Sequence, residues 1–152
     1  MRTRSVIPVV AALALAAPLL AATPAAAAPH QRGLHLEKVQ YNSPGDDDRS
    51  DRSLNAEWVE IHNNGRSAIQ LKGYKLKDNQ NYTYTFGSFK LGAGKKVKVH
   101  TGKGTNTSAK RHWGRGSYVW NNGGDKARLL KPNGSPLDSC SWGRGTTIKN
   151  CY

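Results

Sequence analysis

Residues 57–65 read Glu-Trp-Val-Glu-Ile-His-Asn-Asn-Gly and residues 69–78 read Ile-Gln-Leu-Lys-Gly-Tyr-Lys-Leu-Lys-Asp, and these two segments decide the fold. Apolar and polar side chains alternate in both, which is the period of two expected of a half-buried β-strand. The Asn-Asn-Gly between them tolerates the positive φ angles of a tight turn. Trp58 faces opposite to Val59 and Ile61, so we expect the first strand to be covered on both faces.

Strand-like segments recur along the rest of the chain at intervals typical of a β-sandwich. We predict them at residues 34–41, 57–62, 69–76, 82–86, 96–101, 117–120, 127–131 and 137–142. Asn- and Gly-rich turns separate several of them. No window of useful length shows a helical period. The sequence therefore predicts an all-β domain with two sheets packed face to face.

An ordered set of short blocks connects these segments to a known family. The blocks are Asn55-x-Glu57-Trp58-Val59-Glu60-Ile61, Leu71-x-Gly73-Tyr74-x-Leu76-x-Asp78, Tyr84-Thr85-Phe86, Leu91-Gly92-Ala93-Gly94, Val97-x-Val99-x-Thr101-Gly102-x-Gly104, Val119-Trp120-Asn121-Asn122, Gly124-Asp125-x-Ala127-x-Leu129, Gly134 and Asp138-Ser139. In this order they resemble the lamin tail domain family, over residues 34–142. The resemblance implies an immunoglobulin-like β-sandwich that serves as an interaction module, here in a secreted bacterial single-domain protein. It implies no catalytic residues.

The aromatic side chains favour a scaffold role. Trp58, Tyr74, Trp120 and Trp142 are predicted to lie in the core, where each contributes a large buried area. The alternative is an aromatic platform that stacks on bases or sugars.

The N-terminus has the plan of a secretory signal peptide at residues 1–28. Positive charge precedes an alanine-rich apolar run at residues 6–20, and small residues follow near Ala27 and Ala28, where we expect cleavage. The run is short for a membrane span and contains two prolines, which makes a retained anchor the less favoured alternative. We therefore predict a secreted, extracellular protein without a transmembrane anchor after processing.

The mature chain of about 125 residues fits one domain. After a short lead-in at residues 29–33, we place the sandwich at residues 34–142 and a C-terminal tail at residues 143–152. Cys140 and Cys151, the two cysteines of the sequence, are expected to form a disulfide that closes this tail. Their spacing fits neither a redox C-x-x-C pair nor a zinc site.

The charge of the chain is strongly positive. Without the two signal-peptide arginines, 21 of the 23 Lys and Arg remain against 10 Asp and Glu, which gives a net charge of +11. Such a charge attracts polyanions, among them extracellular nucleic acid and anionic wall polymers, and it also serves general solubility. A protein partner remains an alternative to a polyanion, and the sequence leaves the oligomeric state open.

A basic loop at residues 102–116 is the predicted binding site. Its candidate polyanion-binding residues are Lys103, Lys110, Arg111, His112, Trp113 and Arg115. Cations beside a tryptophan can hold phosphate or sulfate while the ring stacks on a base or sugar. The glycines within the loop are expected to let its backbone approach a ligand. The alternative is a solvated loop whose Trp113 is tucked into the end of the sandwich.

An acidic loop at residues 42–56 is the weaker candidate site. Asp46, Asp48 and Asp51 offer the hard oxygen ligands that calcium prefers. Their spacing lacks the glycine of a helix–loop–helix calcium site, and the flanking segments read as strands. The alternative is a hydrated loop, and we expect no obligatory cofactor.

The residue pattern indicates no catalytic machinery. The five histidines are scattered without a metal-ligand spacing, and no nucleophile motif appears. Glu57 and Glu60 lie three apart on a strand and point to opposite faces, so they are not an acid–base pair. We expect a binding module rather than an enzyme. The alternatives are a structural or protein-interaction domain without a nucleic-acid role and, more distantly, a small secreted hydrolase or nuclease.

Overall fold

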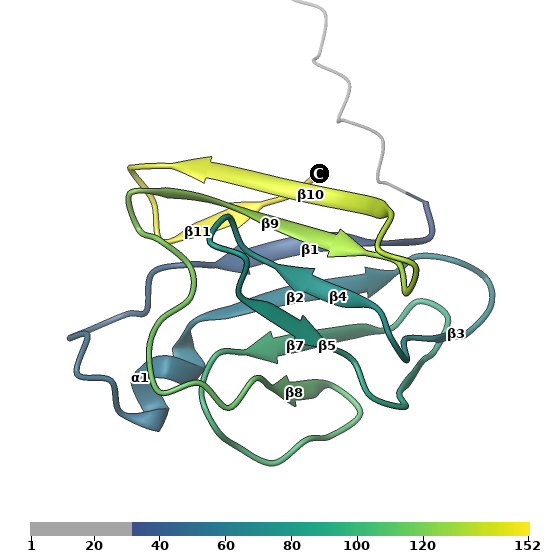
Figure 1. Ribbon diagram of the computed structural model, residues 1–152, viewed down its shortest axis with the longest axis horizontal. Helices are drawn as coiled ribbons and strands as arrows, with labels where there is room; N and C mark the ends of the chain where they lie inside the picture. Colours follow the sequence, from purple (N-terminus) through teal and green to yellow (C-terminus); the bar gives the residue numbers. More distant parts are fainter. Residues whose placement is uncertain (1–31) are drawn as a thin grey trace, which may run out of the picture.

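The computed structural model of the protein describes residues 32–152 (Figure 1). The predicted signal peptide lies outside the described residues, so secretion stays a prediction. Within residues 32–152 no helix has the length and apolar character needed to cross a membrane.

Short strands make up nearly all of the regular structure. In chain order the elements are β1 (Leu34–Gln40), α1 (Asp51–Ala56), β2 (Trp58–Asn63), β3 (Ile69–Gln70), β4 (Lys75–Lys77), β5 (Thr83–Thr85), β6 (Lys90–Leu91), β7 (Lys96–His100), β8 (Lys110–His112), β9 (Gly124–Leu130), β10 (Pro136–Gly143) and β11 (Ile148–Asn150). The all-β prediction is confirmed.

The strands form two main sheets. One has five strands in the order β11-β1-β2-β7-β8, and the other has four in the order β10-β9-β4-β5. Strands β3 and β6 pair separately at the end of the sandwich where Figure 1 shows β3. Neighbouring strands are antiparallel, except that β8 runs parallel to β7 at the edge of the five-stranded sheet. The predicted immunoglobulin-like sandwich is confirmed.

Alternating side chains from the two sheets build the core. Val59 and Ile61 of β2 are fully buried, and so are Leu76 of β4 and Leu129 of β9 in the opposite sheet. Burial of each such aliphatic side chain stabilises the fold by roughly 1.5–3 kcal/mol.

The predicted core aromatics divide into two groups. Trp120 and Trp142 are buried and meet edge to face, while Tyr74 packs against the core from a half-buried position. Trp58 is different, because it lies on the outer face of β2 with the Lys98 ammonium 3.7 Å from its ring centroid. The outer face of β2, which was predicted to be covered, is therefore covered at Trp58 by a lysine side chain that lies over the ring.

Several predicted elements were wrong. The strand expected at residues 69–76 is two strands in different sheets, because the chain turns at Gly73 between them. Residues 117–120 form no strand, since a buried side chain binds their backbone N–H groups instead. The acidic loop contains α1, whose Ser50 side chain caps Ser53 N–H. Six residues are too few to produce a visible helical period.

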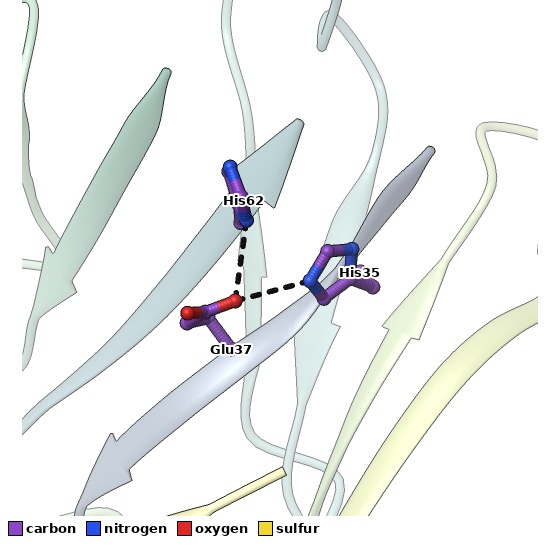
Figure 2. Close-up of side chains that lie close together, drawn as sticks. All are labelled: His35, Glu37 and His62. Carbon is purple, nitrogen blue, oxygen red and sulfur yellow. Dashed lines mark hydrogen bonds and ion pairs between the residues drawn. The ribbon is translucent and has the colours of Figure 1, made fainter. Parts of the chain in front are cut away.

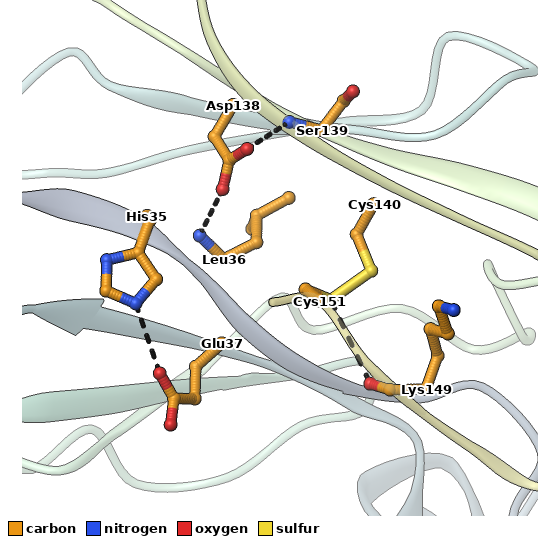
Figure 3. Close-up of a disulfide and its surroundings, with 8 residues drawn as sticks. All are labelled: His35, Leu36, Glu37, Asp138, Ser139, Cys140, Lys149 and Cys151. Atoms are coloured by element: carbon orange, nitrogen blue, oxygen red, sulfur yellow. Dashed lines mark hydrogen bonds and ion pairs between the residues drawn. A yellow bond between two sulfur atoms is a disulfide. The ribbon is translucent and has the colours of Figure 1, made fainter. Parts of the chain in front are cut away.

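The C-terminal residues belong to the sandwich. Strand β11 pairs antiparallel with β1, and Cys151, which follows it, bonds to Cys140 of β10. The predicted disulfide is confirmed, and Figure 3 shows that it joins the two sheets. Nearby, Asp138 Oδ2 accepts a hydrogen bond of 2.7 Å from Leu36 N–H, a second link between β10 and β1 (Figure 3).

Removing the disulfide should destabilise the domain and release β11 first. The Cys140→Ala/Cys151→Ala variant should lose roughly 2–3 kcal/mol of unfolding free energy, because the reduced chain has more conformational freedom when unfolded. Urea denaturation measures this loss, and hydrogen exchange locates it in β11 and β1. Ser139→Ala/Ser141→Ala, on exposed positions of β10, is the control. Equal stability of the cysteine variant and wild type would contradict the stapling role.

Candidate functional site

A buried carboxylate fixes both ends of the basic loop at residues 102–116. Glu57, between α1 and β2, accepts three hydrogen bonds at Oε1: from Thr101 Oγ1 at 3.0 Å, and from the N–H groups of Val119 and Trp120 at 2.9 Å each. Its carbonyl also accepts Thr101 N–H at 3.1 Å. Thr101 precedes the loop and Val119 follows it. One side chain therefore determines where the loop leaves the sandwich and where it returns.

The environment of Glu57 changes its ionisation. Burial raises the pKa of Glu57 to about 7, although the hydrogen bonds from Trp120, Val119 and Thr101 favour the ionised form. Burial thus favours the protonated carboxyl group more than in an exposed glutamate, and the protonated group keeps a carbonyl oxygen that can accept from the loop.

Asn55 of α1 hydrogen-bonds to the first half of the loop. The Asn55 carbonyl lies 2.6 Å from His100 Nδ1, and its side chain donates to Lys103 O at 2.6 Å and lies 3.2 Å from His112 Nδ1. A Cβ on Gly104 would come within 2.3 Å of the His112 ring. The close approach predicted for the loop glycines therefore serves packing within the protein at Gly104.

The second half of the loop packs against aromatic side chains of the sandwich. Trp113 is half-buried beside Tyr84 of β5 and Trp120, with ring centroids 5.9 and 6.1 Å away. This matches the alternative in which Trp113 is tucked into the sandwich. The Arg111 guanidinium lies 3.8 Å from the Phe89 ring centroid, and that of Arg115 lies 4.1 Å from Tyr82.

The six predicted loop residues therefore do not form one cluster. Lys110, Arg111 and His112 make up β8, and His112 stacks on His100 at 5.2 Å between ring centroids. Arg111, Trp113 and Arg115 contact aromatic rings, as described above. Lys103 is exposed in the connection between β7 and β8. The loop is an ordered surface with cations on both sides of the sheet edge.

The acidic side chains are distributed very unevenly. Glu37, Glu57, Asp78 and Asp125 are buried. Glu60 lies near Lys96 and Lys98, and Asp138 accepts backbone N–H groups. The four exposed carboxylates are all in the acidic loop, at Asp46, Asp47, Asp48 and Asp51. Since all ten Asp and Glu of the sequence lie within residues 32–152, the remaining described surface carries cations with little opposing charge.

The predicted calcium candidates have local structural contacts. Asp48 Oδ1 accepts Ser50 N–H at 2.9 Å, the Asp46 carbonyl accepts Ser53 Oγ at 3.1 Å, and Asp51 lies in the first turn of α1. These three carboxylates do not form a group with ligand atoms within 4.8 Å of one another. Calcium binding at this loop stays a prediction.

A different cluster on the five-stranded sheet was missed from the sequence. His35 and Glu37 of β1 meet His62 of β2 on the outer face of the sheet (Figure 2). Burial would raise the pKa of Glu37, but hydrogen bonds from Lys96, His35 and His62 outweigh it and hold the pKa at about 2. The spacing His35-x-Glu37 was the available signal, since alternate residues of a strand share a face.

Comparison with known proteins identifies one family. A family model described as Lamin Tail Domain matches residues 27–144. No curated protein matches the chain. The family is one of non-enzymatic immunoglobulin-like domains, in agreement with the sandwich observed here.

The ionisation of Glu57 should be visible in the pH dependence of stability. The pKa is about 7 in the folded state and about 4.3 in an unfolded chain. The folded state therefore holds the proton more tightly between these values. The resulting stability is fully present below about pH 4 and is lost as the pH rises through about 7. Glu57→Gln keeps an oxygen acceptor but cannot ionise, so this loss should disappear.

Chemical denaturation between pH 4 and pH 8 measures the effect. The difference in unfolding free energy between wild type and Glu57→Gln should change by up to about 3 kcal/mol across this range. Glu60→Gln, on the outer face of β2, should keep the wild-type pH dependence. A Glu57→Gln variant with that same pH dependence would show that folding does not raise the pKa of Glu57.

Proposed function

This chain belongs to the Lamin Tail Domain family, and from that premise we propose that it is a secreted, non-enzymatic module that binds polyanions through its basic loop. The observation that carries the proposal is the placement of the ten carboxylates, of which only those of the acidic loop are exposed. A surface with unopposed cations attracts polyanions and raises their association rate.

The geometry of two arginines supports the loop as the contact surface. Arg111 and Arg115 each lie over an aromatic ring, which limits the motion of the guanidinium groups. A stacked guanidinium still directs its N–H groups outward in its own plane, where they can bind a phosphate or sulfate with two hydrogen bonds. Both side chains are half-buried, so less conformational entropy is lost on binding than for a free arginine.

The loop is also held in a fixed position on the sandwich. Residues on either side of it, Thr101 and Val119, hydrogen-bond to Glu57, and its middle pairs with β7 through Lys98↔Lys110 and His100↔His112. A fixed loop presents its cations in one arrangement, which favours a regularly charged polymer. Extracellular nucleic acid and anionic wall polymers share this property.

Secretion is part of the proposal and has its own support. The disulfide between Cys140 and Cys151 is the kind of bond that persists in an oxidising compartment outside the cytosol. Mass spectrometry of protein recovered from the culture medium should show cleavage near Ala27 or Ala28. Retention of the first 28 residues on the mature chain would contradict the proposed processing.

A salt series with duplex DNA and heparin tests polyanion binding. Affinity should fall steeply as salt increases, because binding releases counterions from the polymer. Arg111→Gln/Arg115→Gln should weaken binding at every salt concentration. It should also reduce the slope of log K against log salt by about 2, since two phosphate contacts are lost.

The matched control removes the same charge from the other sheet. Lys75→Gln/Lys77→Gln lies on β4, whose lysines flank the buried Leu76 and point away from the core. Equal weakening in both variants would indicate attraction by net charge alone and contradict a loop site. Absence of binding at low salt would favour the alternative, a protein-interaction domain without a nucleic-acid role. Thermal melts of both variants confirm that the sandwich is intact.

A further inference from the structure

We propose that His35, Glu37 and His62 form a zinc site on the outer face of the five-stranded sheet. His35 Nε2 lies 3.1 Å from Glu37 Oε2, and His62 Nδ1 lies 3.2 Å from the same oxygen. All three ligand atoms are within 4.8 Å of one another. This inference is independent of polyanion binding, since none of the three residues belongs to the basic loop.

The distances agree with a tetrahedral zinc ion. Zn–N and Zn–O bonds of about 2.0–2.1 Å place neighbouring ligand atoms of a tetrahedron about 3.3 Å apart. The two nitrogen–oxygen separations are already close to this value, and the ligand atoms of the two histidines lie within 4.8 Å of each other. Two imidazoles and one carboxylate form a ligand set that suits zinc better than calcium or magnesium.

The hydrogen bonding of His35 points to a positive ion at this place. His35 Nδ1 lies 3.0 Å from the Gly33 carbonyl, which only accepts hydrogen bonds. Its Nε2 faces Glu37 Oε2, which in a carboxylate also only accepts. A neutral imidazole has one N–H and cannot donate to both oxygens, so the ring either carries a second proton or binds a metal ion at Nε2. A metal ion bound to Nε2 and Oε2 leaves Nδ1–H to donate to the carbonyl, the usual arrangement around a zinc-bound histidine.

A β-bulge lies at the carboxylate of this cluster. The register of β1 on β2 shifts between Leu36 and Lys38, so Glu37 is the extra residue of the bulge. His35 and His62 are direct register partners, and Glu37 lies on their face of the sheet with its carboxylate facing both of them. Bulges are over-represented next to functional sites.

Lys96 leaves the ligand oxygen available. Its ammonium group donates to Glu37 Oε1 at 2.8 Å, whereas both histidines face Oε2. The lysine therefore orients the carboxylate and does not occupy the position of the ion. His35 and Glu37 are buried and His62 is nearly so, which shields the ligands from competing water. Three protein ligands leave a fourth position for water or for a ligand group from a partner.

Metal titration of the protein, expressed without an affinity tag and purified after its natural processing, tests the site. After chelator treatment and in calcium-free buffer, the protein should bind about one zinc ion and its melting temperature should rise. Cobalt in place of zinc should give the strong visible absorption of a tetrahedral site without thiolate ligands. Isothermal titration and cobalt absorption measure the two effects.

Three variants decide the assignment. His62→Gln and Glu37→Gln should each abolish the cobalt spectrum and the zinc-dependent rise in melting temperature. Glu60→Gln should preserve both, although it too removes a carboxylate near Lys96. If Glu37→Gln does not fold, His62→Gln alone decides, because its side chain is partly exposed. Absence of zinc binding in the wild type, or unchanged binding in His62→Gln, would overturn the proposal. The three residues would then form a hydrogen-bonded cluster without a metal ion.

Discussion

The buried carboxyl group of Glu57 is the constraint on which the functional half of the domain depends. Segments 101–102 and 117–120 have no strand partner that could satisfy all their polar groups, and an unpaired buried N–H costs about 1–3 kcal/mol. Glu57 Oε1 supplies the acceptor for Val119, Trp120 and Thr101. Because those segments flank the basic loop, the side chain that satisfies the backbone also positions the loop. Trp120 is itself buried and packs against Trp113, which links the loop to the core.

The same requirement explains the charge of the surface. Asp125 and Asp138, like Glu57, accept backbone N–H groups from turns and strand ends. An all-β domain with many irregular connections needs such acceptors, and carboxylates accept several hydrogen bonds at once. Carboxylates used in this way no longer oppose the lysines and arginines outside. The basic exterior is therefore partly a consequence of how the fold satisfies its own backbone.

The sequence predicted what depends on short-range pattern. Alternation located the buried positions of β2 and β7, and two cysteines permitted one disulfide. The sequence could not predict how the backbone of residues 117–120 is hydrogen-bonded. Their residue pattern is typical of a strand, and the acceptor is some sixty residues away. Likewise, Arg111 and Trp113 alternate in the chain with Lys110 and His112, but only the tertiary structure places Phe89 and Tyr84 beside them. The His–Glu–His cluster depends on the pairing of β1 with β2, which places His62 opposite His35 and which the sequence alone does not show.

Strand β2 connects the two candidate sites. Glu57 precedes its first residue and binds the loop segments, whereas His62 lies near its last residue and faces the outer surface. Between them, Val59 and Ile61 are fully buried against the core and pair with both β1 and β7. The core-facing side chains of the strand are close-packed and have little room to shift when an ion binds at His62. Ion binding at His62 should therefore stabilise the domain without moving the basic loop, so the two sites can be altered separately.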